Sequence, residues 1–293
     1  MDILLQLFNV IVPVFVTAGI GFVLAKRGQA FDASVTTLLV SNFGTPCLVF
    51  AALVKVQLEP DALAAMGLAS VLAMLGFGLF GWLGLRIAKL DPRAFLSSVM
   101  CSNSGNVGLP LCLLAFGEQG LALAVVYFTV SATVMFTVGG ALASGTFSFV
   151  KILKMPFLWA VAAAFAFLAT GLTPPQVVLN TTKLIGGLSI PLMLIALGIS
   201  LASLKVASLP RSLYVSVLRL GIGFSVSYGL ALIMGLDKLQ TGVLVLQSSL
   251  PVAVFNYLFA LRFNRAPEEV AGTVVLSTTM SFSSLPLLIW FLL

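Results

Sequence analysis

Residues 94–117 read AFLSSVMCSNSGNVGLPLCLLAFG, an apolar segment interrupted at its centre by two asparagines, two glycines and a proline. Glycine and proline both disfavour helix, and Pro110 removes the hydrogen bond to the carbonyl of Asn106. Bare backbone at membrane depth is tolerated only where it lines a cavity or is buried in protein. The segment therefore predicts a helix that is broken near its middle.

A second segment, TGVLVLQSSLPVAVFNYLFALRF at residues 241–263, carries a matching break at Pro251, which frees the carbonyl of Gln247. We expect the half-helix after each proline to present free N–H groups and a positive dipole end, equivalent to about +0.5 charge. Two such ends that converge in a dry place favour a carboxylate. The alternative is that Pro, Gly and Asn only kink and pack the two helices.

The composition predicts an all-α polytopic membrane protein. Of 293 residues, 60% are hydrophobic and 8% are charged, with a mean hydropathy of +1.16. So few charges cannot cover the surface of a soluble domain of this length, and so many apolar residues exclude disorder. The basic residues are scattered singly and in pairs, which argues against nucleic acid as a partner.

The absent residue types exclude several chemistries. The chain has no histidine, which removes Ser-His-Asp triads, His-ligated zinc and His proton relays. Cys47, Cys101 and Cys112 lie in apolar runs without CxxC spacing, so we expect neither a disulfide nor a metal site, and no cofactor. GxGD, HExxH and GxSxG motifs are also absent, which disfavours an intramembrane enzyme.

The apolar runs between charged or Pro/Gly-rich breaks predict ten transmembrane helices. The connections are short, so we expect one membrane domain over residues 1–293. The first run lacks a basic n-region and is too long for a signal peptide, so we interpret it as a retained helix. The ten expected segments are residues 3–25, 31–53, 62–85, 93–116, 118–142, 156–172, 176–203, 211–235, 238–263 and 267–293.

Prolines inside these segments indicate an internal repeat of five helices, because three pairs recur at nearly constant separation. We therefore predict one repeat over residues 1–147 and a second over 148–293, inverted in the membrane because five is odd. The fourth and ninth segments would then be antiparallel and cross at their breaks. Pro286 has no counterpart. The pairs are Pro13 with Pro156, Pro46 with Pro191 and Pro110 with Pro251.

The basic residues also predict the orientation. Eleven lie on one set of connections, whereas the other side carries only Lys55 and Lys238. By the positive-inside rule, both termini should lie outside the cytoplasm, in a multi-pass protein of the cell (inner) membrane. The eleven are Lys26, Arg27, Arg86, Lys89, Arg93, Lys151, Lys154, Lys205, Arg211, Arg262 and Arg265.

Three stretches resemble the auxin efflux carrier family, which lies within the bile acid:sodium symporter-like superfamily. They are SNSGNVGLPL at residues 102–111, PLMLIALGISL at 191–201, and the C-terminal run that begins QSSLPVAVFNYLFALRFN at 247. The resemblance covers nearly the whole chain. The short connection over residues 143–155, where plant members have a long loop, is typical of a bacterial type.

The resemblance implies a panel subdomain of helices 1, 2, 6 and 7 that faces a core subdomain of helices 3, 4, 5, 8, 9 and 10. It also implies elevator-type alternating access, with a carboxylate bound where helices 4 and 9 cross. Asn103 would be the main carboxylate ligand, seven residues before the proline. Val252 is apolar where the family carries a polar residue. Together with the reasoning above, the candidate substrate-binding residues are Asn103, Gly105, Asn106, Pro110, Gln247, Ser248, Pro251 and Lys183.

Two basic residues fall inside expected segments. Lys183 would either snorkel to the outer surface or supply positive charge to a passing anion. We interpret Arg219 as snorkelling toward the cytoplasm. No Asp or Glu lies deep in a segment, which disfavours proton coupling.

The sequence thus predicts a uniporter or efflux carrier for a small carboxylate, embedded in lipid, and leaves a homodimer open. One alternative is a sodium symporter on the same fold, with Gln247, Ser248, Ser249 and backbone carbonyls as sodium ligands. The other is an anion channel.

Overall fold

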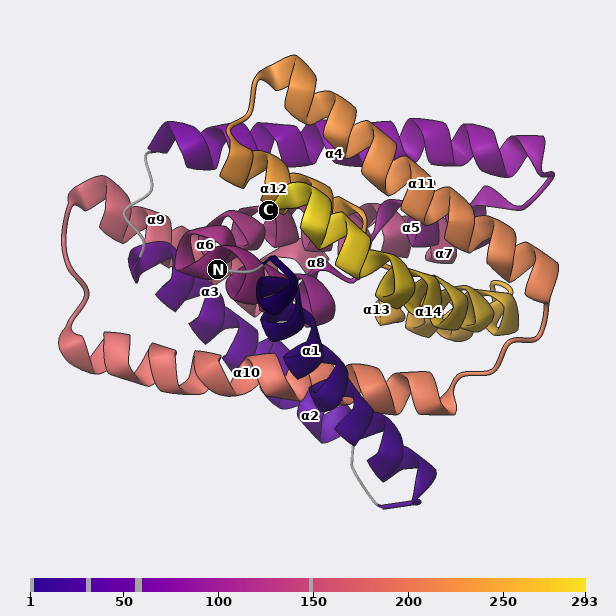
Figure 1. Ribbon diagram of the computed structural model, residues 1–293, viewed down its shortest axis with the longest axis horizontal. Coiled ribbons are helices and arrows are strands. Elements are labelled where there is room, and N and C mark those ends of the chain that lie inside the picture. The colour runs from indigo at the N-terminus through magenta and orange to yellow at the C-terminus, as the bar shows by residue number, and fades with distance from the viewer. Residues whose placement is uncertain (1–2, 30–32, 56–59, 148–149) are drawn as a thin grey trace.

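The computed structural model describes residues 3–29, 33–55, 60–147 and 150–293, and this part of the chain is mainly helical, without a β-strand (Figure 1). The α-helices are α1 (Ile3–Lys26), α2 (Ala33–Leu39), α3 (Thr45–Lys55), α4 (Pro60–Ile87), α5 (Pro92–Met100), α6 (Leu109–Val134), α7 (Gly140–Ser144), α8 (Val150–Leu153), α9 (Pro156–Thr170), α10 (Gln176–Ser203), α11 (Leu209–Met234), α12 (Lys238–Ser248), α13 (Val254–Arg262) and α14 (Pro267–Leu292). Three π-helical turns connect some of them: η1 (Val40–Gly44), η2 (Ser104–Gly108) and η3 (Met135–Gly139).

The surface has the character of a membrane protein. Large apolar side chains are strongly exposed on the outer helices: Ile233 is 84% exposed, Leu184 78% and Leu287 70%. Such side chains would be costly in water but suit lipid. Within the described residues, six helical stretches are long and apolar enough to cross a bilayer, and Val40–Lys55 and Pro156–Thr170 are shorter apolar helices. The all-α polytopic class therefore agrees with the structure, whereas the count of ten spans stays a prediction.

Helix boundaries follow local sequence signals. Gly117 has φ 67° and ψ −160°, so the helical path turns sharply there, at the expected boundary between the fourth and fifth segments. Gly171 and Gly235 end α9 and α11 in the left-handed conformation that glycine adopts without strain. Asp237 begins α12 with a capping box, in which its side chain accepts from the N–H of Gln240.

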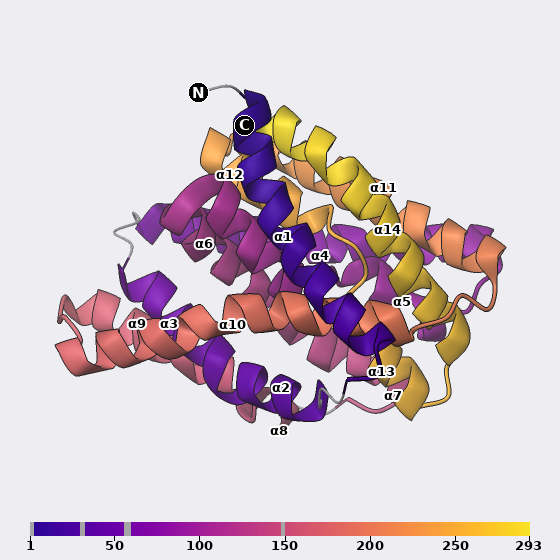
Figure 2. The same cartoon turned by 60° about the horizontal axis from the view of Figure 1, so that its bottom comes forward.

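One group of helices packs around α10, which contacts α1 on one side and α3 on another, while α3 contacts α9 (Figure 2). Glycine allows the close approach of α1. A Cβ on Gly198 would lie 1.9 Å from the carbonyl oxygen of Ala18, and one on Gly21 would lie 2.1 Å from that of Ile195. Small residues at crossings of this kind are typical of packing in membranes.

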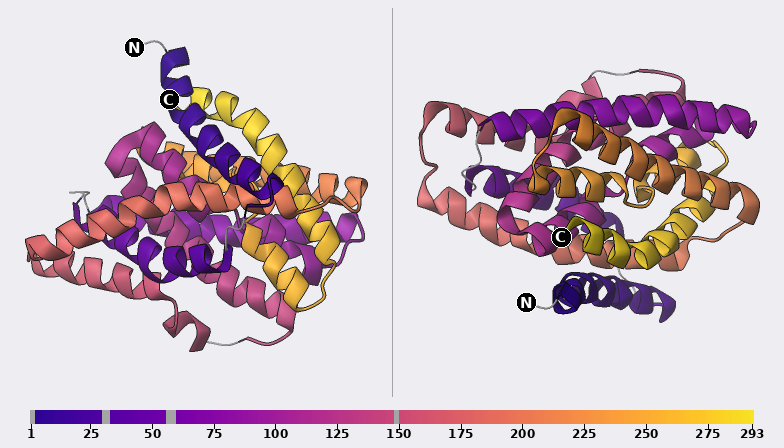
Figure 3. Two further views of the ribbon diagram at one scale, coloured as in Figure 1. Left: turned by 90° about the horizontal axis from the view of Figure 1, so that it is seen from below. Right: turned by 45° about the horizontal axis from the view of Figure 1, so that its top comes forward.

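A second group consists of α4, α5, α6, α11, α12, α13 and α14. Here α11 contacts α4, α12 and α14, and α12 also packs on α6. The two groups lie side by side in the views of Figure 3, and η2 and α6 contact members of the first group. The broken segments α5–η2–α6 and α12–α13 belong to this second group, so their breaks lie inside the molecule.

Candidate functional site

The two breaks meet and satisfy each other's backbone. Cys101 is extended, and Ser102 pairs with Val252 in an isolated antiparallel bridge. The N–H of Asn103 donates to the carbonyl of Pro251 at 2.8 Å, and the N–H of Ala253 donates to that of Cys101 at 3.2 Å. Backbone without helical partners is costly in the membrane, so each break supplies the other's hydrogen bonds.

The first half-helix begins earlier than the proline suggested. We expected it to start after Pro110, but the helical path starts at Ser104, through η2, and Pro110 lies in the first turn of α6. The N–H groups of Val107 and Gly108 both donate to the carbonyl of Asn103 at 3.2 Å. The N–H groups of Ser104 and the next two residues therefore have no acceptor within the helix. Pro110 is thus the seventh residue of a continuous helical path, and its missing N–H leaves a carbonyl of the preceding turn without its helical donor.

The second half-helix, α13, begins at Val254, three residues after Pro251. Ala253 is its N-cap and accepts from the N–H of Asn256 at 3.0 Å. The α13 start, like the η2 start, carries no side-chain cap. Two uncapped, electropositive helix ends are thus present at one crossing.

A cavity of about 470 Å³ lies against both ends. On one side it is lined by the first break and by Ala253, and on the other by residues of η1, α9 and α10. Most of the remaining wall is aromatic or apolar. Among the described residues that line it, Lys154 and Arg262 are cationic and none is acidic. The aromatic part consists of Phe128, Phe136, Phe157, Phe255, Phe259 and Phe263.

Asn103 is the polar side chain best placed to bind a ligand in this cavity. Its side chain is 5% exposed, and its Nδ2 has no hydrogen-bond partner. A buried amide nitrogen that donates to nothing costs free energy until a ligand or water accepts from it. Gly105 and Asn106 also line the cavity, so three of the sequence-predicted residues are together here.

Four other predicted residues lie near the crossing but do not line the cavity. Pro110, Gln247, Ser248 and Pro251 are buried behind it. A Cβ on Gly108 would lie 2.0 Å from Oε1 of Gln247, so this side chain packs on the back of the first break.

Gln247 and Ser248 differ in how their side chains are satisfied. Both polar side-chain atoms of Gln247 lack a hydrogen-bond partner, whereas the hydroxyl of Ser248 donates to that of Tyr127 at 3.2 Å.

Lys183 is not part of this site. It is exposed on α10 and is absent from the cavity wall. Local sequence placed it within an apolar segment but could not tell which way that face of α10 points.

The structure corrects the interpretation of Arg219, which does not snorkel. It is fully buried, and its guanidinium donates to four backbone carbonyls, those of Val99, Met100, Ser248 and Leu250. A signal for this was present in the sequence: Arg219 shares one helix face with a stripe of small residues that pack against protein. The stripe consists of Ser212, Ser216, Gly223 and Ser227, all buried.

These features define a class of protein: a multi-pass membrane protein with paired helix breaks around an internal cavity, built for transport. A family model described as "Membrane transport protein" matches residues 6–146 and 141–291, which together cover nearly the whole chain. The chain belongs to this family, that of the auxin efflux carriers.

Two relatives match over almost their full length. One is an uncharacterised transporter of Methanothermobacter thermautotrophicus, 28% identical over 94% of this chain and 95% of its own length. The other is an uncharacterised transporter of Methanocaldococcus jannaschii, 24% identical over 89% of this chain and 90% of its own. The family and both relatives are described as transporters, not as enzymes.

Proposed function

We propose that this protein is a secondary carrier for a small organic anion, whose carboxylate binds at the crossing of the two broken helices. The observation that supports this most directly is Nδ2 of Asn103, a buried donor without an acceptor beside two electropositive helix ends. A carboxylate accepts hydrogen bonds only, so it suits a site made of donors. Lys154 and Arg262, both exposed, add positive charge along the cavity wall.

The aromatic wall favours substrates in which the carboxylate is attached to an apolar body. Six phenylalanines line the cavity, whereas the cationic side chains on the described part of its wall are those of Lys154 and Arg262, both exposed. Burying a second charge against phenylalanine would be costly, while an apolar body is stabilised there. A monocarboxylate with an apolar or aromatic body is therefore the favoured substrate class, and a cavity of this size is typical of small-molecule sites.

The cavity lies where an alternating-access motion needs it. One wall belongs to the group of α1, α2, α3, α9 and α10, which would be the panel subdomain, and the other belongs to the remaining helices, which would be the core. A core that slides against the panel would carry the bound anion across, as in an elevator. Lys154 and Arg262 lie on connections expected to be cytoplasmic, so this conformation would face the cytoplasm.

The test is a thermal-shift and binding experiment on purified protein with three probes. Phenylpropanoate should raise the melting temperature, because a ligand that binds the folded state stabilises it. Its uncharged amide, phenylpropanamide, should not, since it lacks the anion. Malonate tests the apolar-body argument: a stabilisation by malonate larger than that by phenylpropanoate would overturn it.

The matched variants are Asn103→Ala and Asn180→Ala. Asn180 is exposed on α10 and is paired with Gln176. Asn103→Ala should lose the phenylpropanoate shift while it keeps the melting temperature of the free protein within a few degrees, whereas Asn180→Ala should bind normally. Normal binding by Asn103→Ala would place the site elsewhere.

A further inference from the structure

Arg219 is a buried cation without an anionic side chain beside it. It is the largest fully buried side chain among the residues that the structure describes. Within the described residues, the two ion pairs are Lys55–Glu118 and Arg211–Glu269, and neither involves Arg219. An isolated charge in a protein interior is strongly unfavourable, so something other than a carboxylate must balance it.

Backbone carbonyls at both breaks balance the positive charge of Arg219. Nη1 donates to the carbonyls of Val99 at 2.7 Å and Met100 at 3.2 Å, at the last turn of α5. Nη2 donates to the carbonyl of Ser248, the last residue of α12, and Nε lies 3.4 Å from that of Leu250. All four acceptors belong to helix ends or, for Leu250, to the bend that follows α12, where carbonyls lack helical partners.

The charges of this arrangement match. The C-terminal ends of α5 and α12 each carry a partial charge equivalent to about −0.5, and together they balance one guanidinium. Phe77 covers the guanidinium, with its ring centre 5.2 Å from Cζ. The crossing thus has two sides, because its positive helix ends face the cavity while its negative ends face Arg219.

We propose that Arg219 is a resident cation that occupies the place where a monovalent metal ion would otherwise bridge the two broken helices. Backbone carbonyls and helix C-terminal ends are the groups that hold Na⁺ in carriers built from broken helices. Here the carbonyls of Ser248 and Leu250, which could have served as sodium ligands, accept from arginine instead. A covalently fixed cation cannot be released on either side, so transport is independent of Na⁺. This inference deepens the proposed function, since it assumes that the chain is a carrier.

Thermal stability in different salts tests the inference without any substrate, so its result does not depend on whether the anion site is correctly placed. Wild type should melt at the same temperature in NaCl, KCl and choline chloride of equal concentration. Arg219→Ala leaves four carbonyls around an empty, buried space. This variant should be destabilised in choline chloride and should recover by about 3 °C or more in NaCl or KCl.

Chemical rescue adds a sharper readout. Guanidinium at low millimolar concentration, far below denaturing levels, should raise the melting temperature of Arg219→Ala but not that of wild type. The matched control is Arg86→Ala, since Arg86 is exposed at the end of α4 and covers Trp82. Neither salt nor guanidinium should change its stability relative to wild type.

Two results would overturn the inference. One is a wild-type protein that is stabilised by Na⁺ over choline. The other is an Arg219→Ala variant that is insensitive to Na⁺, K⁺ and guanidinium, which would make Arg219 a purely structural residue. If Arg219→Ala cannot be purified in any salt, the melting temperature of Arg219→Lys in the same salts tests the inference instead. This variant keeps the charge and should remain independent of Na⁺, whereas a sodium-dependent lysine variant would contradict the assignment.

Discussion

The backbone and the side chain of Asn103 have separate roles. Its backbone carbonyl accepts from the N–H groups of Val107 and Gly108, and its backbone N–H holds the second break through Pro251. Its side-chain nitrogen is left without a partner. Because the structural role depends on the backbone alone, the side chain can be changed without removing the hydrogen bonds that hold the crossing together.

Asn103→Asp tests this division. The aspartate has nearly the same shape but places a negative charge where the anion should bind, and carboxylates about 3 Å apart repel strongly. We expect at least a hundredfold loss of affinity for phenylpropanoate, measured by equilibrium binding at neutral pH. Lys183→Met, on an exposed face of α10, should leave the affinity unchanged. A comparable loss in the Lys183 variant would mean that this lysine reaches the anion in another conformation.

At the scale of elements, helix contacts are set by residues that lack a side chain. Gly198 and Gly21 allow α1 and α10 to pack backbone against backbone.

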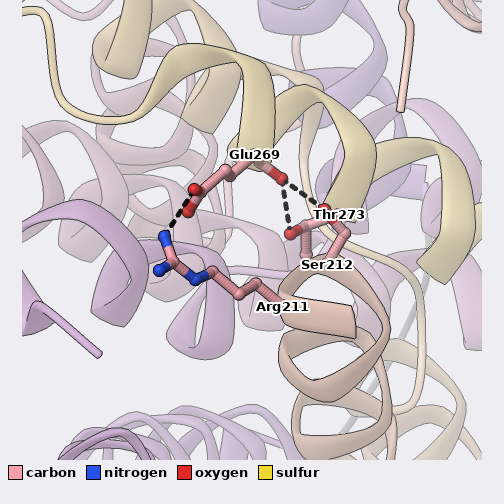
Figure 4. A network of polar contacts seen from close by, with 4 residues as sticks. All are labelled: Arg211, Ser212, Glu269 and Thr273. Carbon is pink, nitrogen blue, oxygen red and sulfur yellow. Dashed lines mark hydrogen bonds and ion pairs between the residues drawn. The ribbon is translucent and has the colours of Figure 1, made fainter. Parts of the chain in front are cut away.

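The starts of α11 and α14 are joined differently, by a polar cluster around Glu269 (Figure 4). The hydroxyls of Ser212 and Thr273 both donate to the Glu269 carbonyl, at 3.0 and 2.9 Å, and Arg211 pairs with its carboxylate at 2.7 Å. The ion pair is largely exposed on the arginine side, so it contributes little, about 0–1 kcal/mol.

Gly198→Ala should separate α1 from α10. Its Cβ would lie 1.9 Å from a backbone oxygen that cannot move without the whole helix. We expect a loss of about 1–3 kcal/mol, the usual cost of overpacking, seen as a lower melting temperature. Gly187→Ala on the same helix has nothing within 4 Å of its Cβ, and it should be neutral or slightly stabilising. Equal effects of the two substitutions would contradict the close packing of α1 on α10.

At the scale of the whole molecule, the positive-inside bias and the cavity together predict sidedness. A single cysteine at Ala207, between α10 and α11, should be labelled by an impermeant maleimide only from the cytoplasm. One at Thr173, between α9 and α10, should be labelled only from outside. Both positions are exposed, and a background without Cys47, Cys101 and Cys112 removes competing thiols. The opposite sidedness would reverse the proposed orientation, and the cavity would then face outward.

Energy coupling is the second property of the whole molecule. The chain has no histidine, the described residues of the cavity wall include no carboxylate, and helix dipoles do not release protons. In proteoliposomes loaded with phenylpropanoate, we expect efflux to follow an imposed membrane potential, which supplies about 2.3 kcal/mol per charge at 100 mV. Sodium or proton gradients of equal driving force should have no effect. Efflux that follows a sodium gradient would favour the symporter, and flux that does not saturate with substrate would favour a channel.

Much of this protein could be predicted from the sequence because the relevant signals are local. Apolar run length and charge distribution indicate a membrane protein with short connections, and the transporter family that the motifs resemble is confirmed. The positions of both helix breaks were predictable too, since Gly, Pro and Asn act on the backbone within a few residues of where they stand. Asn103, Gly105 and Asn106 line the cavity beside the first break, and their role in substrate binding stays a prediction.

Only the tertiary structure decided what each break faces. The first half-helix starts at Ser104, and not after Pro110, next to the hydrogen bond that the N–H of Asn103 donates to Pro251 in the distant second break. Lys183 and Arg219 are both basic residues within apolar segments, yet one is exposed and the other balances two helix ends. Their difference arises from how each helix is rotated about its axis against its neighbours. That rotation depends on contacts between residues far apart in the chain, which no local pattern contains.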